Sequence, residues 1–168
     1  MGIKVDYRSR VDDFKSMVKR LEAVQGVAVE VGVLQGESKW LAAIHEYGLD
    51  IQVTDKMRKY LASQGLYLRK DTTHIHIPER SFLRTGYDKN RDDVMEKAQR
   101  MLADVYAGNM DEDALIKGVG LELSSAIKDY AVELSEPANH PFTIEQKGSS
   151  NPLVDTGDMI GGITWRKA

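Results

Sequence analysis

Two runs of apolar residues at helical spacing, between residues 88 and 133, constrain the fold more than any other feature. In each run the apolar side chains recur every three or four residues, which places them on one face of a helix. The first run comprises Val94, Ala98, Met101, Leu102, Val105 and Tyr106, and the second comprises Leu115, Ile116, Val119, Leu123, Ala126, Ile127 and Tyr130. Gly108-Asn109 ends the first run and Asp111 begins the second. Because the connection is short, residues 88–133 are predicted to form an antiparallel helical hairpin.

The segments on either side of this hairpin predict a small sheet and additional helices. Residues 7–25 have the pattern of an amphipathic helix that ends at Gly26. Residues 27–33 alternate valines with other residues, which is typical of a strand. Ser38 is expected to cap a helix that ends at Gly48. The predicted fold class is α+β: a small, mostly antiparallel sheet packed against two to four helices, with a long extended loop or arm before a C-terminal strand.

Two segments look like additions to a single domain that spans residues 1–168. Residues 49–77 read as a β-containing insertion, with strands at 51–53, 66–68 and 73–77 and a short helix capped by Thr54. Residues 135–152 hold three of the four prolines and are predicted to be a loop or an extended arm, with a short strand at 142–144.

The tail of the chain is unusually rich in conformational signals for a terminus. Asp155 or Thr156 is expected to cap a single turn of helix that Gly161-Gly162 ends. Residues 163–165 then alternate like a last strand, and a strand tied into a sheet would keep the end of the chain ordered.

Composition narrows the classes of function. The chain has 168 residues, no cysteine and a net charge of −3, which argues against thiolate metal sites and against binding nucleic acid through bulk charge. The sequence contains no uninterrupted apolar run long enough to span a membrane, and we expect no membrane contact.

Candidate catalytic patterns are weak throughout. His45-Glu46 lacks the second histidine one turn later that a zincin helix requires, because Leu49 stands there. His74 and His76 lie two residues apart on one face of a predicted strand, where they either ligate a metal or simply face solvent. Asp155 and Asp158 could form a carboxylate pair for magnesium or acid–base chemistry, but helix capping by Asp155 and Thr156 is the favoured interpretation. We therefore expect neither a catalytic residue nor a cofactor or metal site.

Arg80 and Arg84 belong to a basic segment with interleaved aromatics, which could contact nucleic acid. Nearby aspartates reduce its positive field, so a solvated face or a protein contact is the favoured interpretation. Gly118 and Gly120, which lie inside the second helical run, are expected to mark a close helix crossing or a kink.

Three segments, taken in order, resemble the neck or tail-completion proteins of long-tailed bacteriophages, also called the virion-morphogenesis or tail-component family. The segments are IHEYG at 44–48, IPERSFLR at 77–84 and NPLVDTGDMIGGITW at 151–165. The residues that carry the resemblance are His45, Glu46, Tyr47, Gly48, Pro78, Arg80, Phe82, Arg84, Pro152, Asp155, Thr156 and Gly157. The resemblance covers most of residues 27–165 and includes the insertion at 49–77 and the arm.

This resemblance implies a structural role rather than a catalytic one. Proteins of this family form a homo-oligomeric ring at the head–tail junction or the top of the tail, next to head-completion, connector, tail-terminator or tail-tube proteins. The ring leaves a channel through which DNA passes without specific binding. The implied location is the virion, after synthesis in the bacterial host cytoplasm. Under this interpretation Arg80 and Arg84 face a partner subunit or the channel, and the 135–152 arm reaches a neighbour; internal salt bridges and a plain intramolecular loop are the alternatives. A tail terminator or another minor tail protein is the nearest alternative function, and a small metal-dependent hydrolase is a more remote one.

Overall fold

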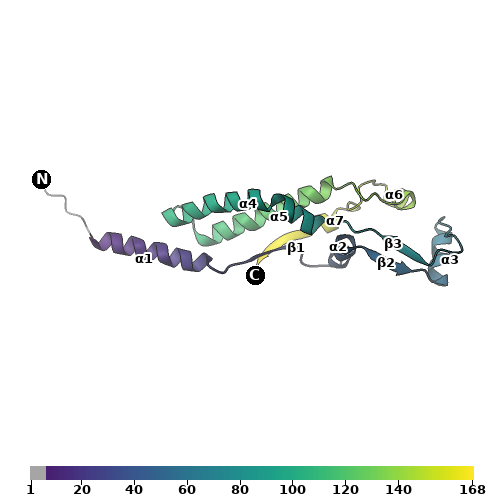
Figure 1. Ribbon diagram of the computed structural model, residues 1–168, viewed down its shortest axis with the longest axis horizontal. Helices are drawn as coiled ribbons and strands as arrows, with labels where there is room; N and C mark the ends of the chain where they lie inside the picture. Colours follow the sequence, from purple (N-terminus) through teal and green to yellow (C-terminus); the bar gives the residue numbers. More distant parts are fainter. Residues whose placement is uncertain (1–6) are drawn as a thin grey trace.

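The molecule is elongated, with a helical hairpin at its centre and a different projection at each end (Figure 1). The computed structural model describes residues 7–168, and the side chains from Asp12 onward. Helix α1 (Tyr7–Val24) extends from one end. Residues 49–77, here called the lobe, project from the other end. Everything between these two projections is called the body.

The predicted helical hairpin is the framework of the body. Helix α4 (Phe82–Ala107) packs along helix α5 (Glu112–Glu133). Asp111 caps α5 as expected, because its carboxylate accepts a hydrogen bond from the Ala114 amide at 2.7 Å. Helix α4 begins at Phe82, six residues before the predicted start at Asp88, since the buried carboxylate of Glu46 supplies its N-terminal cap.

The C-terminal strand is tied into a sheet, which confirms the α+β prediction. Strand β1 (Val29–Val33) pairs antiparallel with β4 (Ile163–Lys167), with Val33 opposite Ile163. The sheet packs against α5, α2 (Ser38–Tyr47) and α7 (Asp158–Gly161). The close approach at Gly120 is made by the sheet and not by a second helix as predicted, because the Trp165 ring of β4 lies where a Cβ atom of residue 120 would stand.

The core lies where the hairpin, the sheet and α7 meet. Its buried members are Val33, Ala42, Phe82, Val94, Leu123, Ile127, Ala131, Leu153, Met159, Ile160 and Ile163. All of them belong to the body, so the apolar stripes read from the sequence on residues 88–133 do face a common interior.

The lobe forms a second, separate two-stranded sheet. Strands β2 (Leu49–Gln52) and β3 (His74–Ile77) pair antiparallel, and helix α3 (Asp55–Ser63) stands at the tip. Thr54 caps α3 as predicted, accepting from the Met57 amide at 3.2 Å. The strand predicted at residues 66–68 is wrong: this segment runs without a strand partner, since β3 takes the edge of β2 instead.

Residues 135–152 contain a short helix rather than the predicted strand at 142–144. Helix α6 (Pro141–Lys147) begins with a proline in its first turn, and the His140 side chain accepts a hydrogen bond from the Phe142 amide. Proline suits the first turn of a helix because its missing amide hydrogen would have no partner there. The local cap therefore prevails over the short alternating pattern.

Two further cap predictions are wrong. Helix α2 is preceded by Glu37 in helical conformation, and Ser38 is its first residue rather than its cap. Helix α7 has Gly157 at its N-cap position, while Thr156 shares hydrogen bonds with Asp158. None of the helices within residues 7–168 combines the length and the apolar character that crossing a bilayer requires.

Candidate functional site

The first two sequence motifs meet where the lobe joins the body. The C-terminal end of α2, with His45, Glu46 and Gly48, lies against the segment from Glu79 to Arg84 that leads into α4. This region is called the motif junction. Both connections to the lobe pass through it, because β2 follows α2 directly and β3 ends just before Pro78. Its geometry therefore determines how the lobe is held.

Glu46 caps helix α4 from outside that helix. Glu46 is only 2% exposed, and its carboxylate accepts hydrogen bonds from the Leu83 amide at 2.8 Å, the Arg84 amide at 3.0 Å and the Ser81 hydroxyl at 3.0 Å. The first amides of a helix have no partner within it, and a negative charge there also favours the helix dipole. Ser81, at the N-cap position, makes no side-chain cap of its own. Glu46 thus replaces a local cap and joins α2 to α4.

Arg84 completes this interaction on the solvent side. Its Nε donates to Glu46 Oε1 at 2.9 Å, and its Nη2 donates to the Glu46 carbonyl at 2.9 Å and to Glu79 Oε1 at 2.7 Å. The guanidinium also lies over the exposed Tyr47 ring, 4.8 Å from its centroid. The hydrogen bond to Glu46, the largest contribution, raises the pKa of Arg84. Arg84 therefore forms ion pairs within its own subunit, which was the predicted alternative to facing a partner subunit or the channel.

Arg80 anchors the segment that was predicted to be an arm. It is 3% exposed, and its guanidinium donates to the Pro137 carbonyl at 2.7 Å, the Ala138 carbonyl at 3.2 Å and Asn139 Oδ1 at 3.1 Å. Burial lowers the pKa of Arg80, and among the described residues no carboxylate pairs with it. Carbonyl oxygens thus compensate this buried charge. Arg80 lies before α4, whereas Arg84 stands in the first turn of that helix.

His45 is a neutral acceptor in the motif junction. Its Nδ1 lies 3.3 Å from Arg80 Nη1, which donates to it, and its backbone carbonyl accepts from the Arg80 amide at 2.6 Å. Burial, and then the positive charges of Arg80 and Lys147, lower the pKa of His45 to about 4. His45 stands in the last turn of α2 as predicted, but near neutral pH it carries no charge with which to favour the helix dipole.

Gly48 is required by the close approach of the two motifs. Its φ is 72°, and a Cβ atom there would stand 2.9 Å from the Ile77 carbonyl oxygen and 3.0 Å from the Glu79 amide nitrogen. Both neighbours are backbone atoms that cannot rotate away, so a side chain at this position forces the two lobe connections apart.

The third motif packs against α2 through helix α7, and its Pro152 is fully buried. The Asn151 side chain accepts from the Leu153 and Val154 amides at 2.9 and 3.0 Å and donates to the Val132 carbonyl at 2.7 Å, which fastens the start of the motif to the end of α5. Asp155 and Thr156 are exposed, and Gly157 has a φ of 90°, as a turn requires.

The structure thus brings His45, Glu46, Gly48, Arg80 and Arg84 into direct contact, with Tyr47 beneath Arg84. Phe82 points into the core and is 0% exposed. Asp155, Thr156 and Gly157 form a separate turn.

Sequence reasoning missed the roles of Ser81 and Asn151. One signal for the junction was available: Glu46 stands one helical turn after Ala42 on an apolar face, and a buried carboxylate needs partners.

The histidine pair of the lobe is separate from this junction. His74 and His76 are exposed on one face of β3, and His76 Nδ1 lies 2.7 Å from Asp50 Oδ1 on the paired strand β2. Within residues 7–168 no group of three or more His, Asp or Glu side chains is arranged to hold a metal ion.

The polar groups of the motif junction form hydrogen bonds to the chain's own backbone and side chains. The arrangement therefore positions one part of the molecule relative to another. Two buried charges, Glu46 and Arg80, orient the base of the lobe and residues 137–139 against the body. Comparison with known proteins adds no identification: no protein-family model, no curated protein and no solved structure matches this chain.

Proposed function

We propose that this chain is a structural subunit of a long-tailed phage particle, which assembles into a ring at the head–tail junction or the top of the tail and so completes the tail for joining to the head. The ordered series of three motifs in the sequence suggests the family, and the geometry of the motif junction supports a role in positioning. Under this proposal the junction sets the angle at which the lobe leaves the body.

The observation that carries the proposal is the unburied lobe. None of the residues in β2, α3 and β3 is buried, although Leu49, Ile51, Ile75 and Ile77 alternate along the two paired strands. An isolated two-stranded hairpin is at best marginally stable in water. A lobe of this kind gains stability by packing against another surface, and in a ring the adjoining subunit supplies that surface.

The edges of both sheets give a second means of association. Each sheet has two strands, and within residues 7–168 each strand is paired along one edge only. Free edges accept an added strand through main-chain hydrogen bonds. By contrast, residues 135–152 are fastened to their own subunit by Arg80 at one end and Asn151 at the other. The lobe therefore replaces the 135–152 arm as the element that we propose reaches a neighbour.

A channel for DNA is compatible with the charge of the subunit. The net charge of −3 gives no excess of positive charge with which to hold phosphates, and a conduit must let DNA move. We propose accordingly that DNA passes without specific binding, and that the assembled protein resides in the virion after synthesis in the bacterial cytoplasm.

Electron microscopy of particles made with and without this chain tests the proposal. Deletion of its gene from the phage or prophage that encodes it should leave filled heads and tails of normal length that do not join, and a plasmid copy should restore joined particles. Tails of abnormal length would instead assign the chain to the tail terminators. Normal, infectious particles from the deletion would contradict both assignments.

A further inference from the structure

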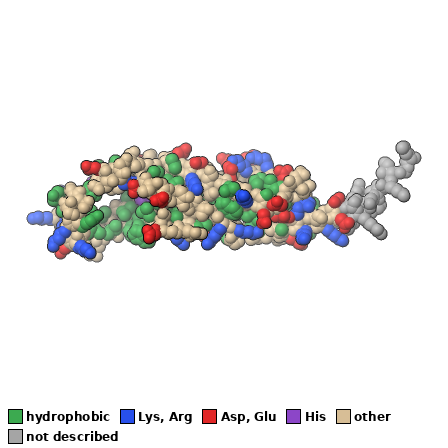
Figure 2. Space-filling view, turned by 180° about the vertical axis from the view of Figure 1, so that it is seen from behind, with side chains coloured by type: hydrophobic (Ala, Val, Ile, Leu, Met, Phe, Trp, Pro, Cys, Tyr) green, Lys and Arg blue, Asp and Glu red, His purple; other side chains and the backbone are tan. Residues whose placement is uncertain are grey.

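The tip of the lobe presents a basic, aromatic surface. On α3, Lys56 is exposed one turn before the adjacent exposed residues Lys59 and Tyr60, and Tyr67 is exposed on the loop that follows the helix. The two tyrosines are 63% and 80% exposed. The lobe holds five basic and three acidic residues, a net charge of +2 in a chain whose overall charge is −3. Lys and Arg side chains accordingly gather at the lobe end of the molecule, the left end in Figure 2.

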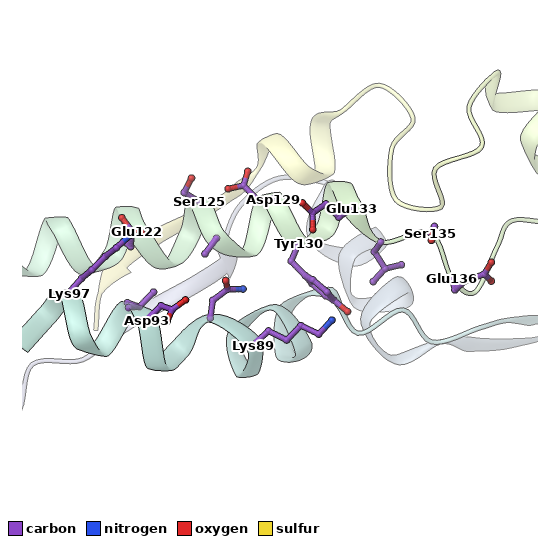
Figure 3. A pocket seen from close by; sticks show the side chains of 14 residues that line it. Lys89, Asp93, Lys97, Glu122, Ser125, Asp129, Tyr130, Glu133, Ser135 and Glu136 are labelled. Atoms are coloured by element: carbon purple, nitrogen blue, oxygen red, sulfur yellow. Dashed lines mark hydrogen bonds and ion pairs between the residues drawn. The ribbon is translucent and has the colours of Figure 1, made fainter.

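The body carries a groove of the opposite charge. It runs between α4 and α5 towards residues 134–136, has a volume of about 730 Å³ and is lined by five acidic and two basic residues (Figure 3). The acidic residues are Asp93, Glu122, Asp129, Glu133 and Glu136, and the basic ones are Lys89 and Lys97.

Both lysines of the groove already have partners. Lys97 pairs with Glu122 across the two helices, and the Lys89 ammonium lies 4.6 Å from the centre of the Tyr130 ring. Asp93, Asp129 and Glu133 are exposed, and none of them forms an ion pair within residues 7–168. Three carboxylates without an ion-pair partner among the described residues therefore face solvent at the groove, Asp93 from α4 and Asp129 and Glu133 from α5, where they attract positive charge.

We propose that the lobe tip of one subunit docks into the α4–α5 groove of a second copy of this chain. This inference rests on the ring assembly proposed above and names the two surfaces that meet. Lys56 and Lys59 stand one helical turn apart, as do Asp129 and Glu133, so two parallel rows of opposite charge can pair. Tyr60 and Tyr67 bring aromatic surface to a groove whose lining includes Val94, Tyr130 and Leu134.

The contact is heterologous, because lobe and groove are different surfaces of the same molecule. The lobe projects from one end of the molecule, beyond helices α4 and α5 (Figure 1), and the groove lies between these two helices, so each subunit offers one donor and one acceptor. Contacts of this kind generate rings when the rotation between neighbours closes and filaments when it does not.

Charge reversal tests the pairing. Lys56→Glu with Lys59→Glu, or Asp129→Lys with Glu133→Lys, should weaken self-association by about tenfold or more in sedimentation velocity at low salt, because two attractions become repulsions. All four changes in one chain should restore association, since the charges are again complementary. Lys15→Glu with Lys117→Glu lowers the net charge by the same amount as the lobe reversal, but outside both surfaces, and should leave association unchanged. Association that survives both reversals would overturn the docking proposal.

Cross-linking tests the same contact when association is too weak to sediment. The chain has no cysteine, so Lys59→Cys and Glu133→Cys each introduce a single thiol. A short bismaleimide should join an equimolar mixture of the two variants into heterodimers far faster than either variant joins to itself. Equal yields, or no cross-link at millimolar protein, would contradict the docking.

These results are independent of the microscopy test. Rings that persist in both reversed variants would be compatible with the proposed function and would contradict only the lobe–groove interface. If the lobe–groove cross-link forms but deletion of the protein leaves particles normal, the interface is supported and the proposed role in the tail is contradicted.

Discussion

The body and the lobe of this molecule are stabilised in different ways. In the body, the hairpin, the β1–β4 sheet and α7 surround a core that includes the fully buried Phe82 and Ile163. In the lobe, two paired strands and one helix contain no buried residue. The lobe relies instead on its strand pairing and on Arg58, whose guanidinium donates to the Leu68, Arg69 and Thr72 carbonyls.

This difference suggests that the body and the lobe have different roles. A body with a buried core keeps its fold without a partner. A lobe held only by local hydrogen bonds has a low free energy of local unfolding until another surface covers it. The motif junction lies between the body with its buried core and the lobe without one, and it places buried charges at the point where the lobe begins.

The largest contrast concerns apolar truncation in the two regions. Phe82→Ala removes a fully buried ring from the core and should lower the free energy of unfolding by about 3–5 kcal/mol. Ile75→Ala, in the half-covered β3 strand, should lower it by about 1 kcal/mol or less. Urea denaturation followed by circular dichroism measures both. Equal losses would mean that Ile75 contributes as much to the stability of the whole chain as the core ring of Phe82, and the comparison would then be wrong.

The next effect concerns the charged cap at the motif junction. Glu46→Gln keeps the shape of the side chain but removes the negative charge that accepts hydrogen bonds from the Ser81 hydroxyl, two backbone amides and the Arg84 guanidinium. The variant should lower the free energy of unfolding by about 3 kcal/mol. Glu79→Gln removes the exposed partner of the same arginine and serves as the matched control, with an expected loss below about 1 kcal/mol. Similar losses in the two variants would show that burial of Glu46 contributes nothing beyond a surface ion pair.

The smallest effect is a pH dependence that originates at His45. Its pKa is about 4 in the folded protein, below the ordinary 6.5. Between these two values the unfolded chain binds a proton that the folded chain does not, so stability is full above pH 6.5 and falls as the pH drops towards 4. After allowance for the partial exposure of the ring, His45 should account for about 1–2 kcal/mol at pH 5 relative to pH 7.

His45→Gln isolates this contribution, because glutamine retains an acceptor for Arg80 and does not titrate. The difference in unfolding free energy between the variant and the parent protein should change with pH only between about 7 and 4. A constant difference over that window would mean that His45 has an ordinary pKa in the folded state.

Much of this arrangement was readable from periodicity. Helical spacing in residues 88–133 and alternation in residues 27–33 identify the hairpin and a strand, because each pattern must bury one face. Thr54 and Asp111 cap the helices they were expected to cap, and Gly48 and Gly157 take the positive φ that their turns require. These features depend on neighbours within a few residues, so the local sequence determines them.

The functional geometry depended on contacts between distant segments. That Glu46 caps α4, that Arg80 holds residues 137–139, and that β3 rather than residues 66–68 pairs with β2 follow from the approach of segments far apart in the chain. Sequence spacing specifies which residues can lie on one face of an element. Only the tertiary structure determines which buried charge meets which unpaired amide or carbonyl, because the cost of leaving such groups without partners is settled over the whole fold.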